Sequence, residues 1–379
     1  MTIKVMTVFG TRPEAIKMAP VVLGLEQDPD FESVVCVTAQ HREMLDQVLD
    51  IFGIDPSYDL DLMKPMQTLY DVTKDALCGV GEIIRSARPD VVLVHGDTTT
   101  CFAASLAAFY EGVPVGHVEA GLRTGNLRAP FPEEGNRALV GRLTSFHFAP
   151  TKVAVENLKK ENINSEDILE TGNTVIDALH IAKEKVDELP EAIWIKNFGS
   201  DVFDRVTDSN RKLILITGHR RENFGSGFVD LCNAIKKLAE SHKDWDFIYP
   251  VHLNPNVQKP VYEILGGLTN VKLIDPLSYL SFVWLMAKSD LILTDSGGVQ
   301  EEGPSLGKPV LVMRDVTERP EAVKVGTVRL VGTKTDAIVE GVETVLCNAL
   351  VYEKMSTAIN PYGDGLATQR ILDYLRLAL

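Results

Sequence analysis

The most restrictive feature of this 379-residue sequence is an alternation of short apolar runs with segments of helical periodicity, which continues nearly from end to end. The apolar runs have the length and continuity of strands buried on both faces, and segments such as Ala103–Tyr110 and Val229–Ala239 have helical spacing. That order predicts parallel sheets covered by helices on both faces. Eleven strands are more than one open sheet usually holds, so we expect two doubly wound, Rossmann-like α/β domains. The predicted strands are Ile3–Phe9, Ser33–Thr38, Asp90–His95, Pro114–Val118, Phe146–Ala149, Leu213–Thr217, Phe247–Val251, Val271–Ile274, Leu291–Thr294, Val310–Met313 and Thr327–Val331.

The alternation breaks between residues 183 and 211, where the chain is polar and carries a proline, a glycine and a cluster of turn-forming residues. Such a break is typical of a connection between domains. We therefore place the first domain at residues 1–172 and the second at residues 173–359. Residues 360–379 begin with a turn-forming run and continue as a helix.

Composition narrows the class of protein. Hydrophobic residues make up 45% of the chain and charged residues 24%, which is typical of a soluble globular protein. The formal net charge of −15 argues against a nucleic-acid-binding surface. No apolar run approaches the roughly 18 residues of a membrane span, the N-terminus lacks the layout of a signal peptide, and the five cysteines are widely spaced. We expect a cytoplasmic protein that binds neither nucleic acid nor membrane.

A double-glycine turn follows the predicted strand Leu291–Thr294. The turn contains Ser296, Gly297 and Gly298, and a helix-compatible segment begins directly after it. Unpaired N–H groups at a helix N-terminus, together with the helix dipole, favour a phosphate there. Glu302 lies about one helical turn further on, where its carboxylate could accept hydrogen bonds from a ribose. An ordinary strand-to-helix turn is the alternative.

The first strand also ends in a turn with basic residues, because Arg12 and Lys17 follow it within two helical turns. Both are expected at the carboxyl edge of a sheet near a helix N-terminus, where an anion site and two merely solvated side chains fit equally well. The chain contains neither the G-x-G-x-x-G fingerprint of dinucleotide binding nor a Walker A loop.

Two further strands end in a histidine and an acid two residues apart, His95 with Asp97 and His117 with Glu119. Glu133 follows after a loop. Since the carboxyl ends of parallel strands bind ligands in open α/β sheets, the three carboxylates could converge on one wall of a cleft. Acid–base catalysis and a metal site of His, Asp, His and Glu both fit this pattern. The structural alternative is that the acids cap helix N-termini, which suits Asp97 well.

In the second domain, the strand Leu213–Thr217 leads into a histidine and two arginines, His219, Arg220 and Arg221. A pyrophosphate carries about two negative charges, so a site without a metal needs several such cations. A second histidine, His252, also ends a strand, and we expect it to play a supporting or structural part.

Together these stretches resemble the non-hydrolysing UDP-N-acetylglucosamine 2-epimerases of bacteria, and the likeness extends from the first strand to the last helix. The matching motifs are FGTRPEAIKMAP (Phe9–Pro20), TAQHREMLDQV (Thr38–Val48), VLVHGDTTT (Val92–Thr100), GHVEAGLRTG (Gly116–Gly125), TGNTVIDAL (Thr171–Leu179), GHRREN (Gly218–Asn223), VHLNPNV (Val251–Val257), DSGGVQEE (Asp295–Glu302), SLGKPVLVMRD (Ser305–Asp315), TERPEAV (Thr317–Val323) and NPYGDG (Asn360–Gly365). Several long motifs in one order make the resemblance specific.

The resemblance implies a glycosyltransferase-B-like architecture, with two Rossmann-like domains around a central cleft. It implies that the C-terminal helix crosses back, so that residues 360–379 join residues 1–172. It also implies a homodimer that binds UDP-GlcNAc, UDP-ManNAc and UDP, and that interconverts the two sugars without NAD or an essential metal, feeding surface polysaccharide synthesis.

Site residues carried over by motif fall into two groups. Those implied to be catalytic are Asp97, Glu119, Glu133 and His219. Those implied to bind substrate are Arg12, Lys17, Phe282, Ser296, Gly297, Gly298, Glu302 and Arg319, with Phe282 beside the uracil.

The chemistry makes sense of this inventory. The proton on sugar carbon 2 adjoins no carbonyl, so epimerisation needs either oxidation by NAD or elimination of UDP followed by its re-addition. The missing dinucleotide fingerprint favours elimination, which needs acid and base groups on both sugar faces and cations on the diphosphate. A retaining glycosyltransferase, a non-catalytic nucleotide-sugar sensor and a hydrolysing epimerase are the competing hypotheses.

Overall fold

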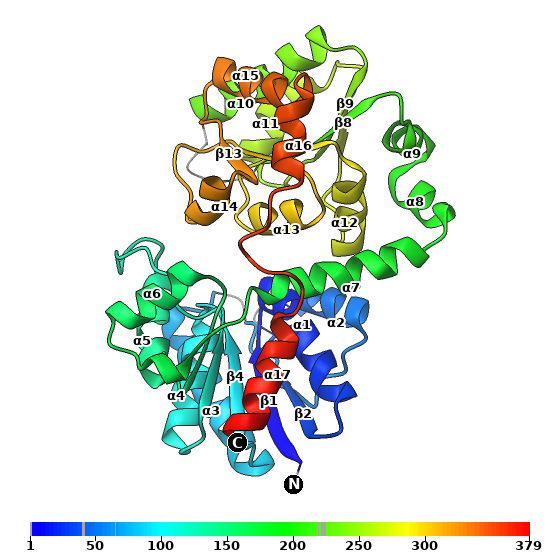
Figure 1. Ribbon diagram of the computed structural model, residues 1–379. Coiled ribbons are helices and arrows are strands. Elements are labelled where there is room, and N and C mark those ends of the chain that lie inside the picture. The colour runs from blue at the N-terminus through cyan, green and yellow to red at the C-terminus, as the bar shows by residue number, and fades with distance from the viewer. Residues whose placement is uncertain (1, 40–41, 65, 219, 221–224) are drawn as a thin grey trace. The chain divides into compact units, whose positions relative to one another are not determined.

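The computed structural model describes residues 2–39, 42–64, 66–218, 220 and 225–379. The chain forms two compact units, one comprising Met1–Ile181 with Tyr362–Leu379 and the other Ala182–Pro361. Figure 1 traces both along the sequence. Helix α7 (Thr174–Glu188) begins in the first unit and ends in the second. No helix in the described part of the chain is long and apolar enough to span a membrane.

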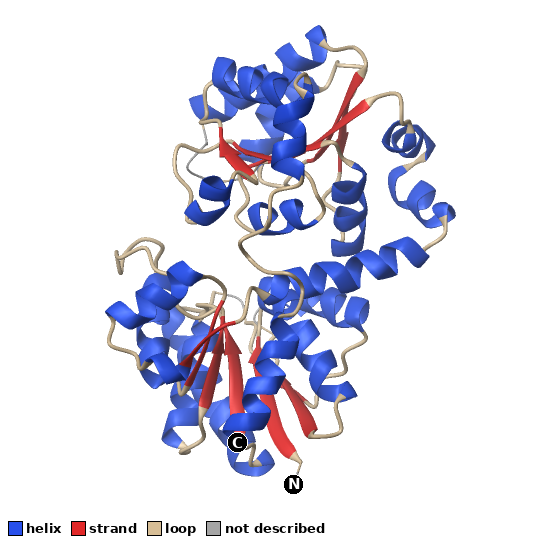
Figure 2. Cartoon of the chain, in the orientation of Figure 1, coloured by secondary structure: helices blue, strands red, loops and turns tan. Residues whose placement is uncertain are grey.

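The first unit is built on a sheet of strands with helices packed around it (Figure 2). The sheet is parallel, and its described residues form seven strands in the order β3-β2-β1-β4-β5-β6-β7. The order runs outward in both directions from the β1–β4 pair. Right-handed crossovers therefore place the helices on opposite faces of the sheet. The strands are β1 (Ile3–Phe9), β2 (Phe31–Val37), β3 (Tyr58–Asp59), β4 (Val91–His95), β5 (Val115–Val118), β6 (Phe146–Ala149) and β7 (Ile168–Glu170). The other helices are α1 (Arg12–Gln27), α2 (Arg42–Phe52), α3 (Leu69–Ala87), α4 (Thr99–Tyr110), α5 (Glu133–Leu143), α6 (Lys152–Lys160) and α17 (Ala367–Ala378), with a 3-10 turn at Ser165–Asp167.

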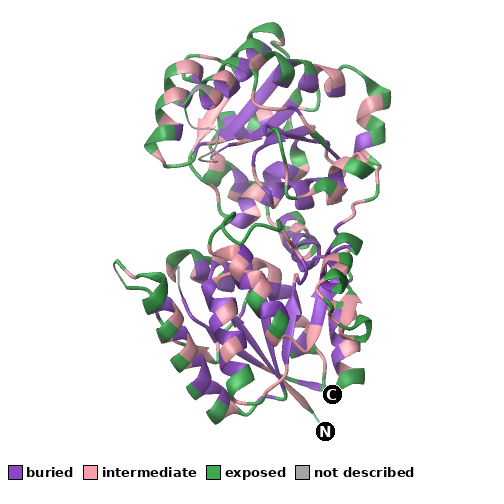
Figure 3. Ribbon diagram, turned by 90° about the vertical axis from the view of Figure 1, so that its left-hand side faces the viewer, coloured by how far each residue is buried: buried purple, intermediate pink, exposed green. Residues whose placement is uncertain are grey.

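The second unit repeats this plan, with six parallel strands among its described residues in the order β10-β9-β8-β11-β12-β13. Its largest core packs the sheet against α10, α11 and α15, and Figure 3 shows buried residues along the strands of both units. The strands are β8 (Lys212–Thr217), β9 (Trp245–Pro250), β10 (Val271–Ile274), β11 (Leu291–Thr294), β12 (Val310–Val312) and β13 (Val328–Leu330). The helices are α8 (Glu191–Phe198), α9 (Ser200–Thr207), α10 (Ser226–Ser241), α11 (Pro255–Leu265), α12 (Tyr279–Lys288), α13 (Val299–Ser305), α14 (Pro320–Val325), α15 (Thr335–Leu346) and α16 (Ala349–Ser356).

The predicted fold class is confirmed, and each of the eleven predicted strands is present with ends shifted by at most a few residues. Two strands were missed, β3 and β7. They are two and three residues long and lie at the edges of the sheet, so neither has an apolar run to reveal it. The polar interval between residues 183 and 211 is largely helical, forming the end of α7 with α8 and α9.

The C-terminal helix belongs to the first unit. Helix α17 packs against α1, where the absence of a side chain at Gly24 makes room for it: a Cβ there would lie 2.9 Å from Thr368 Cγ2. Arg376, near the end of α17, forms ion pairs with Asp28 and Asp30 beyond the end of α1. These contacts hold the last segment of the chain on the first unit.

Three buried histidines lie on neighbouring strands of the first sheet. His95 ends β4, and His117 on β5 is the register partner of His147 on β6. Burial lowers the pKa of His95 and of His117 to about 4 and that of His147 to about 3. Each is therefore neutral near pH 7, and protonation of any of them opposes folding.

We predict that these three histidines bind protons below pH 6.5 in the unfolded chain, whereas in the folded chain they do so only near pH 4 for His95 and His117 and near pH 3 for His147. The free energy of unfolding should therefore decrease as the pH is lowered from 6.5 toward 4, by about 1.4 kcal/mol per pH unit for each buried histidine. His147→Gln should show a shallower fall in urea unfolding followed by circular dichroism, whereas His180→Gln, at an exposed position, should match the wild type. Equal slopes for His147→Gln and the wild type would contradict this account.

Candidate active site

Two strand ends of the first sheet carry the acids predicted to be catalytic. Asp97 lies in the turn after β4, and Glu119 is the first residue after β5. Glu119 has a φ of +66°, a left-handed conformation that non-glycine residues adopt rarely and that clusters at functional sites. The capping alternative for Asp97 is wrong, because Thr98 is the N-cap of α4 and its Oγ1 accepts the N–H of Cys101 at 3.0 Å.

The Glu119 carboxylate is held by side chains from three other elements. The ammonium of Lys17, on α1, forms an ion pair with Oε1, and the amide Nδ2 of Asn173 donates to the same oxygen at 2.8 Å. His95 Nε2 lies 3.6 Å from Oε2. The pKa of His95 is low because burial and the charge of Lys17 outweigh the attraction of Glu119, so the imidazole is a neutral neighbour at pH 7.

Asp97 is paired with Arg137, whose Nη2 contacts the Asp97 carboxylate from α5. Burial raises the pKa of Asp97, and the Arg137 charge opposes that rise. The other charges that act on Asp97 are those of Glu119, Lys17 and Glu133. The charges of Glu119 and Glu133 therefore lie close enough to act on the ionisation of Asp97.

Helix α5 begins with two acids that have different surroundings. Glu133 is close enough to Asp97 for its charge to act on it, and its Oε2 is buried without a hydrogen-bond partner among the described residues. Glu134 is a structural tether: its Oε1 accepts the N–H groups of Thr124 and Gly125 at 2.9 Å each, and its Oε2 accepts from Arg137 at 3.1 Å. Among the described residues, Glu133 thus has a carboxylate oxygen without a hydrogen-bond partner, whereas both oxygens of Glu134 are bonded.

The basic turn after β1 lies at the same carboxyl edge. Arg12 is the first residue of α1, and the helix is fixed by a capping box in which Glu14 accepts the N–H groups of Gly10 and Thr11 at 3.1 and 2.8 Å. The structure therefore groups Lys17 with the three acids and places Arg12 at the start of the helix that carries Lys17. Within the described residues, no three His, Cys, Asp or Glu side chains are grouped to hold a metal ion.

The double-glycine turn of the second unit joins β11 to α13. A Cβ at Gly297 would lie 2.9 Å from Arg319 Nη1. Because glycine has no side chain, the Arg319 guanidinium can lie against the backbone of the turn. Arg319 is fixed there by an ion pair from its Nε to Glu301 Oε1 at 2.5 Å. At the start of the turn, the N–H of Ser296 donates to Thr294 Oγ1 at 2.9 Å. The predicted residues Ser296, Gly297, Gly298 and Arg319 therefore share one loop edge of the second unit.

Glu302 and Phe282 are linked through helix α12. Glu302, on α13, is buried, and its Oε1 accepts the hydroxyl of Tyr279 at 3.0 Å. Tyr279 is the first residue of α12, and Phe282 lies one turn later, half-buried. The predicted ribose-binding and uracil-binding residues thus lie on adjoining elements of the second unit.

An arginine cluster lies near the same turn. The Arg220 backbone N–H donates to Asp295 Oδ2 at 2.8 Å, and its guanidinium lies 3.7 Å from Glu318. Glu318 also accepts two hydrogen bonds from Arg314, at 2.8 and 3.1 Å. Burial raises the pKa of Glu318, but the hydrogen bonds and charges of these arginines outweigh it and lower the pKa to about 2. The predicted catalytic His219 lies outside the described residues.

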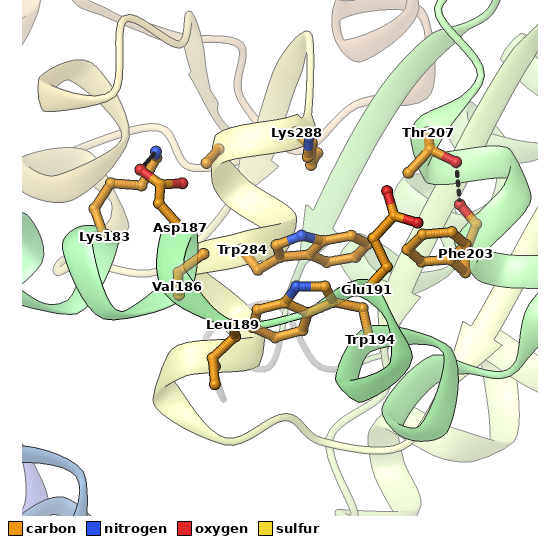
Figure 4. Close-up of a pocket in the computed structure, with 11 residues that line it drawn as sticks. Lys183, Val186, Asp187, Leu189, Glu191, Trp194, Phe203, Thr207, Trp284 and Lys288 are labelled. Atoms are coloured by element: carbon orange, nitrogen blue, oxygen red, sulfur yellow. Dashed lines mark hydrogen bonds and ion pairs between the residues drawn. The ribbon is translucent and has the colours of Figure 1, made fainter.

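A separate cavity of about 250 Å³ in the second unit is lined by aromatic rings (Figure 4). Trp194 and Trp284 stack at 5.0 Å between ring centroids, and Phe203 lies parallel to Trp284 at 6.1 Å. These rings are buried against one another and join α8 and α9 to α12. None of the predicted site residues lines this cavity.

Comparison with known proteins identifies the family. The family model described as UDP-N-acetylglucosamine 2-epimerase matches residues 24–376. The chain is 58% identical over 376 residues to the UDP-N-acetylglucosamine 2-epimerase of Escherichia coli (strain K12), with 98% of both chains covered. The chain belongs to the UDP-N-acetylglucosamine 2-epimerase family. The predicted family and enzyme class are therefore confirmed.

Solved structures of other 2-epimerases have the same fold. The UDP-GlcNAc 2-epimerase from Neisseria meningitidis, bound to UDP-GlcNAc, is 52% identical with a TM-score of 0.90, covering 99% of this chain and 100% of that one. The Methanocaldococcus jannaschii enzyme, in complex with UDP-GlcNAc and UDP, is 31% identical with a TM-score of 0.79 and the same coverage. A glycosyltransferase from Rickettsia africae ESF-5, 16% identical with a TM-score of 0.63 over 99% of this chain and 98% of that one, shares the fold alone, which confirms the predicted glycosyltransferase-like architecture.

Sequence reasoning missed two polar residues that hold the acids of this epimerase. Arg137 is four residues after Glu133, so a helix that starts at Glu133 places both on one face, and this spacing could have revealed it. Asn173 follows β7, the short strand that was also missed. Recognition of β7 would have placed Asn173 at the carboxyl edge of the sheet.

We predict that Arg137→Gln raises the pKa of Asp97, since it removes the cation that opposes the effect of burial. The acidic limb of the pH profile of kcat/KM should shift upward by about one unit or more. Arg137→Lys, which keeps the charge, should shift it less. Arg142→Gln changes an exposed arginine of the same helix and should leave the limb in place; a limb unmoved in Arg137→Gln would show that Arg137 does not control this ionisation.

Proposed function

We propose that this epimerase interconverts UDP-GlcNAc and UDP-ManNAc by elimination and re-addition of UDP. The observation that carries the proposal is the grouping of Asp97, Glu119 and Glu133 beside Lys17 at one edge of the first sheet. The ligands in the solved structures of the related 2-epimerases, UDP-GlcNAc and UDP, support the choice of substrate.

The reaction needs no change of oxidation state. A carboxylate removes the proton from sugar carbon 2 while the bond from carbon 1 to the diphosphate oxygen breaks. The electron pair of the broken bond leaves with UDP, and a double bond forms between carbons 1 and 2 of a 2-acetamidoglucal. A carboxylic acid then protonates carbon 2 on the opposite face, and UDP adds back to carbon 1. Atoms and electrons balance, because the proton removed is replaced by one proton added.

Two groups of residues divide the work in this proposal. The carboxylates of Asp97, Glu119 and Glu133 serve as acids and bases, because the reaction needs a proton acceptor on one face and a donor on the other. Asp97 suits the exchange of a proton, since burial holds its pKa above the usual range. The cations hold the diphosphate and stabilise the charge that develops on departing UDP. We assign this second part to Arg12, Lys17, His219 and Arg319.

The nucleotide is assigned to the second unit. Ser296, Gly297 and Gly298 would bind phosphate, Glu302 the ribose and Phe282 the uracil. Support comes from the clamped guanidinium of Arg319 at Gly297 and from the buried Glu302 carboxylate beside α12. A homodimer, a cytoplasmic location and a supply of product to surface polysaccharide synthesis are proposed from the resemblance alone.

We predict that turnover in deuterated water places deuterium on carbon 2 of the product, because the proton added there comes from an acid that exchanges with solvent. Product NMR with UDP-GlcNAc as substrate measures this and identifies the sugar at the same time. UDP-ManNAc without label at carbon 2 would contradict elimination. Free ManNAc as the product would indicate the hydrolysing alternative, and transfer to an added acceptor sugar would indicate a glycosyltransferase.

A further inference from the structure

The chain passes between the two units twice, through α7 and again after Pro361. Inside the first unit these two connections cross at a pair of glycines. A Cβ on Gly172 would lie 3.2 Å from Gly363 Cα, and the φ angles of the two glycines are +85° and +131°. Side chains other than hydrogen are therefore excluded from the crossing by both space and backbone conformation. The crossing explains why TGNTVIDAL and NPYGDG, two motifs with no part in the chemistry above, pack against each other.

Asn173, beside this crossing, is buried, and three of its hydrogen bonds run in different directions. Its backbone N–H donates to the Tyr362 carbonyl at 2.6 Å, which ties the two connections together. Its Oδ1 accepts the N–H of Val175 at 3.1 Å, at the start of α7. Its Nδ2 donates to Glu119 Oε1 at 2.8 Å. One amide side chain thus joins the start of α7 to a carboxylate of the active site.

The neighbours of Glu119 determine the position of its backbone and its carboxylate. Its backbone has a left-handed φ of +66°, a conformation that persists in a non-glycine residue only where the surroundings enforce it. The Lys17 ammonium can pair with Glu119 Oε1 from many directions, whereas the planar amide of Asn173 donates in one direction. The amide therefore restricts the orientation of the carboxylate, whose Oε2 lies on the side of His95.

We propose that Asn173 is a positioning residue that orients the Glu119 carboxylate for proton transfer and joins it to both connections between the units. The inference rests on the proposed function, in which Glu119 exchanges a proton with sugar carbon 2. A misoriented carboxylate still binds substrate but reaches the proton less often, so the effect falls on kcat rather than on KM.

Two substitutions separate this role from the structural ones. Asn173→Ser keeps an oxygen that can cap α7 but is too short to donate to Glu119. Asn173→Asp keeps the size and the cap but replaces the amide donor with a carboxylate. Each should lower kcat by roughly 10- to 100-fold with KM little changed. Thermal unfolding should stay near that of the wild type in Asn173→Ser, whereas Asn173→Asp should unfold at a lower temperature because it places a second carboxylate beside Glu119. A kcat near that of the wild type in both variants would overturn the proposal.

Asp177 offers a matched control on the same crossing. Its carboxylate accepts the N–H groups of Ala367 and Thr368 at 3.3 and 2.8 Å, and so holds the start of α17 without a contact to Glu119 that the structure records. Asp177→Asn should lower Tm while kcat stays near that of the wild type. An equal loss of kcat in Asp177→Asn would assign the effect of Asn173 to the crossing as a whole and overturn its positioning role.

A double-mutant cycle with Glu119→Gln gives the decisive comparison. Glu119→Gln alone should lower kcat by about 100-fold or more. Adding Asn173→Ser to Glu119→Gln should lower kcat by less than about threefold further, because Asn173 acts through the Glu119 carboxylate. The same factor for Asn173→Ser in both backgrounds would overturn the proposal while the role of Glu119 stands. Full activity of Glu119→Gln would instead overturn the proposed function of that residue.

Discussion

The active edge of the first sheet depends on ion pairs that balance a concentration of negative charge. Burial opposes the ionisation of Asp97, and the charges of Glu119 and Glu133 add to that cost. Lys17 and Arg137 compensate by pairing with Glu119 and Asp97. Loss of either cation would leave a partly buried carboxylate without its partner, which is far more costly than the loss of an exposed pair. In the proposed reaction the same arrangement would help Asp97 to exchange a proton, because burial holds its pKa above the usual range.

The second unit uses its charges differently. Arg319 is paired with Glu301 and Arg314 with Glu318, so both guanidinium groups are held in place before a ligand binds. Preorganised cations stabilise a developing negative charge without the cost of rearrangement when it appears. Gly297 is part of this arrangement, since its lack of a side chain is what lets Arg319 lie against the turn.

The fold and the grouping of acids at one edge of the first sheet could be predicted from sequence because both follow from periodicity. Continuous apolar runs define the central strands, and parallel topology brings the residues after β4 and β5 to one edge of the sheet. That reasoning located Asp97 and Glu119 without any knowledge of side-chain contacts. Strands β3 and β7 were not predicted because edge strands of two or three residues bury too little apolar surface to produce an apolar run in the sequence.

The partners of the acids could not be predicted in the same way. Arg137 meets Asp97 from 40 residues away and Asn173 meets Glu119 from 54 residues away. Helical spacing from Glu133 and recognition of β7 could have brought both residues to this edge of the sheet, but neither signal says which acid each residue contacts. The left-handed backbone of Glu119 gives no sequence signal either, since the residue is not a glycine. The role of the glycine pair at Gly172 and Gly363 emerges only once the chain has been brought together from both ends.

Elimination requires that the bond between sugar carbon 1 and the diphosphate breaks and re-forms during each epimerisation. UDP-GlcNAc labelled with oxygen-18 at the atom bridging carbon 1 and the β-phosphorus tests it directly. If UDP departs, the β-phosphate can rotate before re-addition, so label in the recovered substrate should move from the bridging to the non-bridging positions as turnover proceeds. Label that stays in the bridge while UDP-ManNAc accumulates would contradict elimination and require a route in which that bond remains intact.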